Sequence, residues 1–390
     1  MTAAASVPAV CLVGHPYAPI GMGEHVRLTF RAMRAAGMRP AISDIYDLNE
    51  KEPGQLAEFS PFEVTTFGRI NVWHINGDEL AQALPHTAAR QVPGSYNVIY
   101  PAWELSKYPD TWARQLDAFD EVWAPSLFIR DSIAASVRVP VVHMPLACEV
   151  LLESFLGRRA FGIRESALAF LFFFDVRSFQ SRKNPEAVID AFSRLAERRP
   201  EADILLVIKV NGAEQNPAGF DALRQRASTL GARVLFLQQL MTDNEVKNLV
   251  RCCDAFVSLH RSEGFGRGMA EAMCLGRAVV ATGYSGNMDF CDEDTALLVP
   301  YTLVDVPEGA YPHAADQVWA DPDVATAASL MERLLDEPAL ATDLGRRAAL
   351  RMQKGFSLRI AGARFRARLA AIQQQTTGTA AVSATGAHDA

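Results

Sequence analysis

The sequence lacks any apolar run that approaches the ~20 residues with which a helix crosses a bilayer. Its N-terminal part has no basic region ahead of the short apolar run from Val10 to Val13, so no signal peptide is expected. Basic residues are fewer than acidic ones, with 38 Lys and Arg against 45 Asp and Glu, and the formal net charge is −7. We therefore expect a cytoplasmic protein that attaches at most peripherally to the inner face of a membrane and does not bind nucleic acid.

Cysteines with the spacing of a metal site or a redox motif are also missing. The 390-residue chain has no C-x-x-C pair, which predicts reduced thiols at Cys11, Cys148, Cys252, Cys253, Cys274 and Cys291. The signatures G-x4-G-K-[ST], H-E-x-x-H and G-x-S-x-G do not occur. The D-x-D triplets at 292–294 and 321–323 are interpreted as a solvated turn and as caps of a following helix, and not as metal sites.

What the sequence does contain is a repeated alternation of short apolar runs with helical segments, which is typical of doubly wound parallel sheets. The alternation stops at residues 146–166 and starts again with "ALAFLFFF". We therefore predict an α/β protein of two Rossmann-like domains that face a cleft. The expected bounds are 1–155 and 156–354 for the two domains, 355–375 for a final helix and 376–390 for a disordered Thr/Ala/Gly-rich tail.

The stretch "HRSEGFGRGMAEAM", residues 260–273, places Glu263 and Glu271 around three glycines. It follows a predicted strand, so Glu263 is expected on a loop at the carboxyl end of the sheet and Glu271 inside the next helix. A glycine-rich loop that opens a helix offers N–H groups to phosphate, and carboxylates accept hydrogen bonds from sugar-like hydroxyls. The alternative is that Glu263 caps the helix and Glu271 is solvated.

A second stretch, "FFFDVRSFQSRKNPE", ends another predicted strand and carries Arg177, Arg182 and Lys183. Three cations at the carboxyl end of a strand in an acidic protein suggest an anion pocket. The alternative is a solvated basic loop, and Arg182 fits that alternative best of the three.

Four residues of the first domain are candidates for contact with a ligand. His25 begins a helix after a glycine loop, His74 stands at a strand end, and Trp103 with Glu104 follows the next strand. Each carries the alternative of a structural or surface role.

Taken in this order, the two charged loops resemble those of the retaining GT-B glycosyltransferases of the group 1 family (family 4). The Glu-x7-Glu motif of that family stands here as "SEGFGRGMAEAMCLGRAVVAT", and Arg177 and Lys183 fit its Arg/Lys pair by spacing. The match covers most of the second domain, where Arg267 and Ala278 depart from the usual aliphatic residue and proline. In the first domain, "WEL", "YPDTW" and "DEVWAPSLF" resemble more weakly the members that build bacterial surface polysaccharides.

The resemblance implies a role for each matching residue. Glu263 would bind the donor sugar beside its anomeric carbon, and Arg177 and Lys183 would neutralise the diphosphate, so these three are the expected catalytic residues. Glu271 would bind the ribose. The other implied donor-binding residues are Gly21, Gly23, Arg182, Gly264, Phe265, Gly266, Gln239, Met241 and Asn287, and the acceptor side would comprise His25, His74, Trp103 and Glu104.

The activity that the resemblance implies is hexosyl transfer with retention, from a nucleotide-diphosphate sugar to a saccharide or lipid-linked saccharide in surface polysaccharide synthesis. GDP-mannose is the first donor to consider. No metal and no cofactor are expected, because Arg and Lys would neutralise the diphosphate, and the final helix would cross back to the first domain. Two other hypotheses stay open: a non-catalytic subunit that binds a sugar nucleotide, and a glycoside hydrolase that uses the two glutamates as acid and nucleophile.

Overall fold

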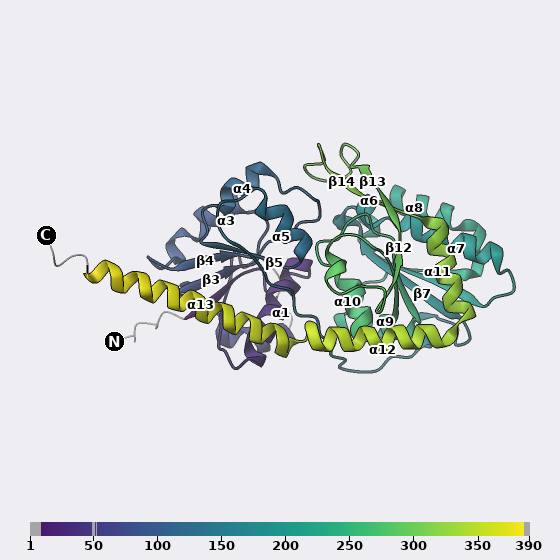
Figure 1. Ribbon diagram of the computed structural model, residues 1–390. Helices are drawn as coiled ribbons and strands as arrows, with labels where there is room; N and C mark the ends of the chain where they lie inside the picture. The colour runs from purple at the N-terminus through teal and green to yellow at the C-terminus, as the bar shows by residue number, and fades with distance from the viewer. Residues whose placement is uncertain (1–8, 49–50, 52, 386–390) are drawn as a thin grey trace. The chain divides into compact units, whose positions relative to one another are not determined.

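The computed structural model describes residues 9–48, 51 and 53–385, and the side chains of Arg177 and of residues 377–385 lie outside this description. The chain divides into two compact units. Unit 1 comprises residues 1–103, 107–147 and 355–390, and unit 2 comprises residues 104–106 and 148–354. Each unit contains a six-stranded sheet flanked by helices (Figure 1), which confirms the predicted α/β class with two Rossmann-like folds.

Unit 1 is built on a parallel sheet with the strand order β2-β1-β3-β4-β5-β6. The strands are short and largely buried, as expected for a parallel sheet covered by helices. They are β1 (Val10–Gly14), β2 (Ala41–Asp44), β3 (Ile70–Trp73), β4 (Tyr96–Ile99), β5 (Glu121–Ala124) and β6 (Val141–His143). The helices are α1 (Gly21–Ala35), α2 (Pro53–Phe59), α3 (Leu80–Thr87), α4 (Asp110–Leu116), α5 (Leu127–Ala134) and α13 (Leu358–Thr385), with short 3₁₀ turns η1 (Ser60–Phe62) and η2 (Ala88–Arg90).

Unit 2 contains a second parallel sheet, with the order β12-β11-β10-β7-β8-β9. Its strands are β7 (Leu168–Asp175), β8 (Ile204–Asn211), β9 (Val234–Leu237), β10 (Ala255–Ser258), β11 (Ala278–Thr282) and β12 (Leu297–Val299). Its helices are α6 (Gln180–Lys183), α7 (Pro185–Arg198), α8 (Pro217–Arg226), α9 (Asp243–Cys252), α10 (Arg267–Cys274), α11 (Val324–Asp336) and α12 (Pro338–Gly355). The 3₁₀ turns are η3 (Arg158–Phe161), η4 (Val176–Ser178), η5 (Ala213–Gln215), η6 (Ser228–Arg233) and η7 (Gly286–Asp289), and β13 (Tyr301–Asp305) pairs antiparallel with β14 (Val318–Pro322).

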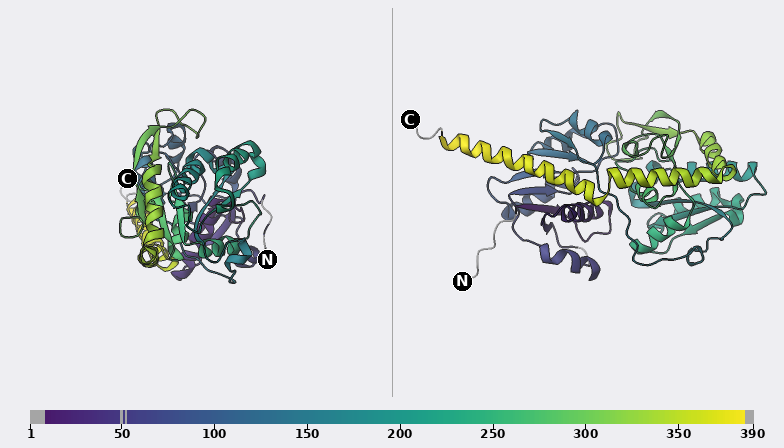
Figure 2. Two further views of the ribbon diagram at one scale, coloured as in Figure 1. Left: turned by 90° about the vertical axis from the view of Figure 1, so that its right-hand side faces the viewer. Right: turned by 60° about the horizontal axis from the view of Figure 1, so that its bottom comes forward.

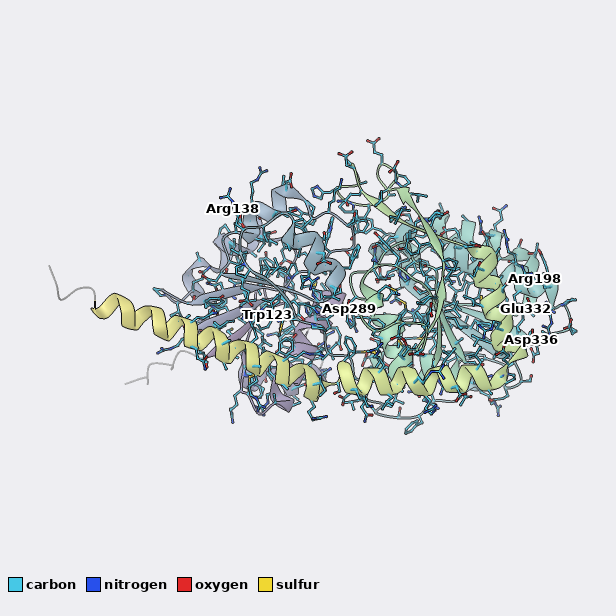
Figure 3. All side chains as sticks on the ribbon, in the orientation of Figure 1. Trp123, Arg138, Arg198, Asp289, Glu332 and Asp336 are labelled. Carbon is cyan, nitrogen blue, oxygen red and sulfur yellow. The ribbon has the colours of Figure 1, made fainter. Side chains whose placement is uncertain are left out.

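Local signals explain where several of these helices start and what they pack against. Asp323 accepts hydrogen bonds from the N–H groups of Ala325 and Thr326 at 2.8 and 3.0 Å, which confirms the predicted cap of α11. Helices α7 and α11 bury apolar faces in one core cluster, and at the surface Arg198 pairs with Glu332 across 3.3 Å (Figure 3). Such an exposed pair contributes little, so apolar burial is what joins the two helices.

The final helix belongs to unit 1, as the predicted fold requires. It lies beside α1 (Figure 2), and Gly362 permits the close approach, because a Cβ atom there would lie 2.0 Å from the Ala32 carbonyl oxygen. Phe365 stacks on Trp123 with ring centroids 5.5 Å apart, and the Arg368 Nε donates to buried Glu121 at 2.8 Å. None of the described helices is both long and apolar enough to span a membrane.

Two boundaries differ from the predicted ones. Helix α13 continues to Thr385 through residues expected to be disordered, and of the predicted tail residues 386–390 lie outside the described part. Extending a helix that already exists needs no new nucleation, and alanines favour it. The division between the units falls at 147/148 instead of 155/156, and residues 104–106 join unit 2, because Glu104 bonds to side chains of that unit.

Candidate functional site

The two charged loops of unit 2 follow β7 and β10, which are neighbours in the sheet although they are distant in sequence. The strand order reverses between these two strands, since the chain runs outward from β7 to β9 on one side and from β10 to β12 on the other. In doubly wound sheets, ligands bind at the carboxyl ends of the strands at such a reversal. The fold therefore brings Lys183 and Glu263 to the position where a ligand is expected.

Glu263 lies at the centre of a compact ionic cluster. It is buried, and its Oε1 accepts from the Lys183 Nζ at 2.5 Å while its Oε2 accepts from an Arg182 Nη1 at 3.2 Å. Burial by itself would raise the pKa of Glu263, but the charges of Lys183 and Arg182 outweigh burial and lower the pKa to about 2. The carboxylate is therefore ionised at neutral pH and remains a hydrogen-bond acceptor.

The backbone around Glu263 is fixed by the loop that follows β11. The Glu263 N–H donates to the Ser285 Oγ at 2.8 Å, and the Gly286 N–H donates to the Glu263 carbonyl at 2.9 Å. Asn287, one of the residues expected to bind the donor, supports this loop. Its Nδ2 donates to the Thr282 carbonyl, and its Oδ1 lies 3.1 Å from the Nε2 of buried His260.

Gly286 is a position where a side chain cannot fit. A Cβ atom there would lie 1.9 Å from the Gly264 carbonyl oxygen and 2.9 Å from that of Glu263, both of them backbone atoms. We expect Gly286→Ala to lower the free energy of unfolding by about 3 kcal/mol, measured by urea denaturation. Gly283→Ala is the matched control, because its nearest neighbours would lie at 3.6 Å, an ordinary contact distance. Equal stability of the two variants would contradict the expectation.

Arg182 is buried, so it is not the solvated cation that its loop position suggested. It is only 4% exposed, and its Nη1 donates to the Ser262 carbonyl at 2.8 Å as well as to Glu263. Its Nη2 donates to the Ser178 carbonyl at 3.2 Å and lies 4.0 Å from a Glu104 carboxylate oxygen. In this conformation Arg182 thus holds Glu263 and the loops around it, and its contact with a donor stays a prediction.

Tyr311, on the loop between β13 and β14, is a residue of this cluster that sequence reasoning missed. Its hydroxyl donates to the Glu104 Oε2 at 2.5 Å, and its ring lies beside Phe179 with centroids 4.6 Å apart. Burial, and next the charge of Glu104, raise the pKa of Tyr311, so the phenol stays a donor. Glu104 was expected on the acceptor side with Trp103, but the fold groups it with Arg182 and Tyr311 in unit 2.

Lys183 is the cation of the cluster that keeps the most contact with solvent, since its side chain is 21% exposed against 5% for Arg182. Burial lowers its pKa, and the charge of Glu263 opposes that shift. The position of Arg177 is known only for its backbone in η4, directly after β7, because its side chain lies outside the description.

Helix α10 begins directly after Gly266, whose φ of 92° lies in the left-handed region that glycine tolerates. The Arg267 Nη2 donates to the Glu271 Oε1 at 3.0 Å, so the residue that departs from the family pattern pairs with the predicted ribose ligand one turn away. Gly268 lets the helix approach the sheet, because a Cβ there would meet the rings of Phe173 and Phe256 at 2.9 Å. An isolated glycine inside a helical pattern was the available sequence signal for this contact.

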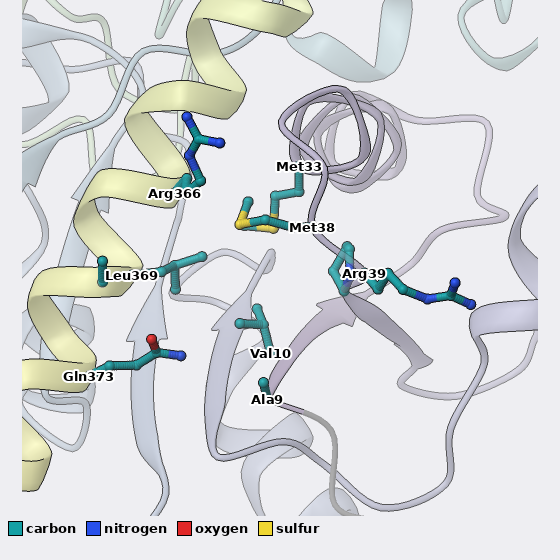
Figure 4. Close-up of a pocket in the computed structure, with 10 residues that line it drawn as sticks. Ala9, Val10, Met33, Met38, Arg39, Arg366, Leu369 and Gln373 are labelled. Carbon is teal, nitrogen blue, oxygen red and sulfur yellow. The ribbon is translucent and has the colours of Figure 1, made fainter.

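A small cavity lies against the ionic cluster and the start of α10. Its volume is about 30 Å³, and its lining includes Lys183, Glu263, Gly266 and Met269. That volume suits on the order of one water molecule. A larger cavity of about 320 Å³ lies in unit 1, where Met33, Met38 and Leu369 face one another and the Arg39 side chain points away (Figure 4). It is at the start of β1, the end opposite to the one where ligands of such sheets bind.

The remaining predicted donor residues are spread over both units. Gly264 and Phe265 lie in the loop with Glu263, and Phe265 is buried against Phe290. Gln239 and Met241 follow β9, an edge strand two places from β7, so they do not join the Glu263 cluster.

Gly21 and Gly23 open α1 in unit 1. A Cβ atom at Gly23 would lie 2.1 Å from the Ala18 carbonyl oxygen, which accounts for the glycine on steric grounds.

The other acceptor candidates are core residues of unit 1. His25, His74 and Tyr100 pack ring against ring, with centroids 4.7 Å apart for the two histidines and 4.2 Å for His25 and Tyr100. Burial lowers the pKa of His74 to about 3, and its ring nitrogens have no hydrogen-bond partner in the described part of the chain. Trp103 is 2% exposed and donates its indole N–H to the Lys107 carbonyl, so it lies in the core of unit 1, and its contact with an acceptor stays a prediction.

Among residues 9–48, 51 and 53–385, no group of three or more His, Cys, Asp and Glu side chains is placed to hold a metal ion. The expectation that the protein works without metal stays a prediction.

Comparison with known proteins gives a family match for part of the chain and a consistent fold. Residues 163–351 match the sequence model of the family described as "Glycosyl transferases group 1". A mannosylfructose-phosphate synthase of Agrobacterium fabrum is 35% identical over 109 residues, 27% of this chain and 24% of that protein. A D-inositol 3-phosphate glycosyltransferase of Pseudarthrobacter chlorophenolicus is 30% identical over 200 residues, 50% of this chain and 41% of that protein. The matches thus span less than half of either relative. The solved structure of HepE from Anabaena in complex with UDP has a TM-score of 0.67 at 14% identity and covers 93% of this chain and 100% of that one.

Proposed function

We propose that this protein, whose residues 163–351 carry a group 1 glycosyltransferase domain, moves a hexosyl group from a nucleotide-diphosphate sugar to a saccharide or lipid-linked saccharide, with retention at the anomeric carbon. The observation that carries the proposal is the Lys183–Glu263–Arg182 cluster at the point where the strand order of unit 2 reverses. A structural ion pair alone would not need to stand at the ligand end of the sheet.

The chemistry that the cluster supports is electrostatic. When the sugar leaves, negative charge develops on the nucleotide diphosphate, and a fixed ammonium together with N–H groups at the start of a helix stabilises it. Lys183 and the first turn of α10, which begins at Arg267, would supply these groups. Glu263 would accept hydrogen bonds from donor-sugar hydroxyls, because Arg182 and Lys183 keep it ionised.

Binding of a donor would exchange partners inside the site. Lys183 forms an ion pair with Glu263, and Arg267 forms one with Glu271. A diphosphate would compete for Lys183, and ribose hydroxyls would compete with Arg267 for Glu271. We propose that Arg267, released from Glu271, serves as a further phosphate contact near the N-terminus of α10.

For the donor we propose GDP-mannose, and for the setting the synthesis of surface polysaccharide. The similarity to a mannosylfructose-phosphate synthase supports a mannosyl donor, whereas UDP in the HepE structure supports a uridine nucleotide. The names of the two curated relatives also favour a second candidate, transfer to a small polar acceptor such as a sugar phosphate or inositol phosphate. Transfer assays with both acceptor classes separate these candidates.

Thermal denaturation with added nucleotides tests the proposal before any acceptor is known. A nucleoside diphosphate present at 100 times its Kd stabilises the folded protein by about 2.7 kcal/mol, which corresponds to roughly 5–10 °C in Tm. We expect GDP or UDP, but not the free nucleoside, to raise Tm, and EDTA to leave the shift unchanged. If none of GDP, UDP and dTDP shifts Tm, donor binding is ruled out.

Turnover separates the other hypotheses. A non-catalytic subunit would bind a nucleotide without transferring sugar to any acceptor. A glycoside hydrolase would release sugar from a glycoside that carries no nucleotide, and the two glutamates would then have to face each other across one groove. Glu271 instead pairs with Arg267 on its own helix.

A further inference from the structure

Two of the six cysteines, 126 positions apart in the sequence, meet inside unit 2. The Cys274 Sγ lies 3.6 Å from the Cys148 Sγ and 3.4 Å from the Cys148 carbonyl oxygen. Both are free thiols. The sequence spacing gave no sign of this contact, because neither cysteine belongs to a C-x-x-C pair.

The surroundings of the pair allow the sulfurs to come closer. A disulfide bond is about 2.05 Å long, so the sulfurs must approach by roughly 1.5 Å. Cys274 is the last residue of α10, and residues 144–152 around Cys148 lie in neither a helix nor a strand. A segment outside regular structure adjusts without breaking a ladder of hydrogen bonds, so this approach disturbs neither the sheet nor the body of α10.

The two thiols differ in solvent exposure, which determines which of them an oxidant modifies first. Cys148 is 6% exposed, whereas Cys274 is partly exposed. The hydrogen bond with Cys274, and then burial, hold the pKa of Cys148 well above its ordinary value. An oxidant from solution therefore reaches Cys274 first, with Cys148 beside it as the resolving thiol.

We propose that Cys148 and Cys274 form an oxidisable dithiol, a modification site at the end of α10 that a peroxide converts into a disulfide. The Cys274 sulfur gives two electrons to hydrogen peroxide and becomes a sulfenic acid, and one water leaves. The Cys148 sulfur then attacks the Cys274 sulfur, the S–S bond forms, the S–O bond breaks, and the hydroxyl leaves with the Cys148 proton as a second water. Two thiols are thus oxidised and one peroxide is reduced.

The position of the pair connects this chemistry to the helix that carries Glu271. Cys274 follows Glu271 by three residues, so both lie on one face of α10 about one turn apart. The disulfide would tie that end of the helix to the segment in which unit 2 begins. The formation of the bond itself does not depend on the proposed function.

The test is disulfide mapping of the full chain after treatment with a few equivalents of hydrogen peroxide. Free thiols are alkylated, the protein is digested, and mass spectrometry locates the cross-linked peptides. We expect one cross-link, between the peptides of Cys148 and Cys274, with the other four cysteines alkylated. Oxidation should raise Tm by about 5 °C, because the bond closes a long loop of the unfolded chain, and dithiothreitol should reverse the shift.

Variants sharpen the test. Cys148→Ser should abolish the cross-link and leave Cys274 open to further oxidation. The control is Cys252→Ser, which removes a thiol bonded to the Leu156 carbonyl and should keep the cross-link. The mapping itself uses the natural chain, so it does not depend on how the variants fold. Recovery of both peptides in alkylated form from folded, peroxide-treated protein would overturn the proposal. No donor is needed, so failure here would leave the nucleotide-binding test unaffected.

Discussion

Replacing Lys183 by alanine is expected to lower kcat for glycosyl transfer by roughly 10²–10³, the usual effect of removing one group that stabilises charge in the transition state. Lys183 bonds to Glu263 through its terminal ammonium and is more exposed than Arg182. Arg182 cannot substitute for it, because its Nη atoms are bonded to two backbone carbonyls and to Glu263. The fold should persist, since Glu263 keeps Arg182 as a partner.

The matched control is Lys247→Ala, which removes a lysine of unit 2 that pairs with exposed Asp243 on α9. Its kcat should stay within about a factor of two of the natural chain. Steady-state kinetics with the donor found in the nucleotide screen gives kcat and KM separately. A lower kcat with little change in KM indicates that Lys183 stabilises charge in the transition state. Equal turnover of the Lys183 and Lys247 variants, with both proteins folded, would remove Lys183 from the mechanism.

The sequence carried enough information to predict the two sheets and the place of the ionic cluster. Short apolar runs separated by helical patterns predicted parallel strands, and parallel strands place their following loops at one edge. Lys183 follows β7 and Glu263 follows β10. These strands are neighbours at the strand-order reversal, so the two residues meet although 80 positions separate them. The contact of Glu271 with Arg267 could also have been predicted, because their i, i+4 spacing places them on one helix face.

Contacts that depend on how loops pack could not be predicted from the sequence. Tyr311 and Glu104 are 207 residues apart and share no periodic pattern, yet together they enclose Arg182. The solvated position that the sequence suggested for Arg182 is therefore wrong, since a cation in a loop before a helix gives no sign that two other loops will bury it. The same holds for His74 and Trp103, which follow strands as ligand-binding residues do but lie inside the core of unit 1.

Exchanging Glu263 for glutamine is expected to lower the free energy of unfolding at neutral pH by about 3–5 kcal/mol, the effect of removing one partner of a buried ion pair. Arg182 would stay buried, and its remaining ion-pair partner in the described part of the chain would be Glu104, 4.0 Å from its Nη2. The variant should also lose transfer activity. The matched control is Glu332→Gln, which removes a carboxylate from a more exposed pair with Arg198 and should change stability by less than about 1 kcal/mol.

The pH dependence of the stability lost in Glu263→Gln distinguishes a contribution of the ion pair from one of packing. The pKa of Glu263 falls from its ordinary value of 4.5 to about 2 on folding. A carboxyl group with a lowered pKa stabilises the fold fully above pH 4.5 and loses that contribution as pH falls towards 2, here about 3 kcal/mol in all. The difference in unfolding free energy between the natural chain and Glu263→Gln should thus be constant from pH 5 to 7 and shrink below about pH 4.5. Urea denaturation at a series of pH values down to 3 measures it. Curves that stay parallel over this whole range would mean that Glu263 stabilises the loop by its shape and hydrogen bonds, and that its charge contributes nothing.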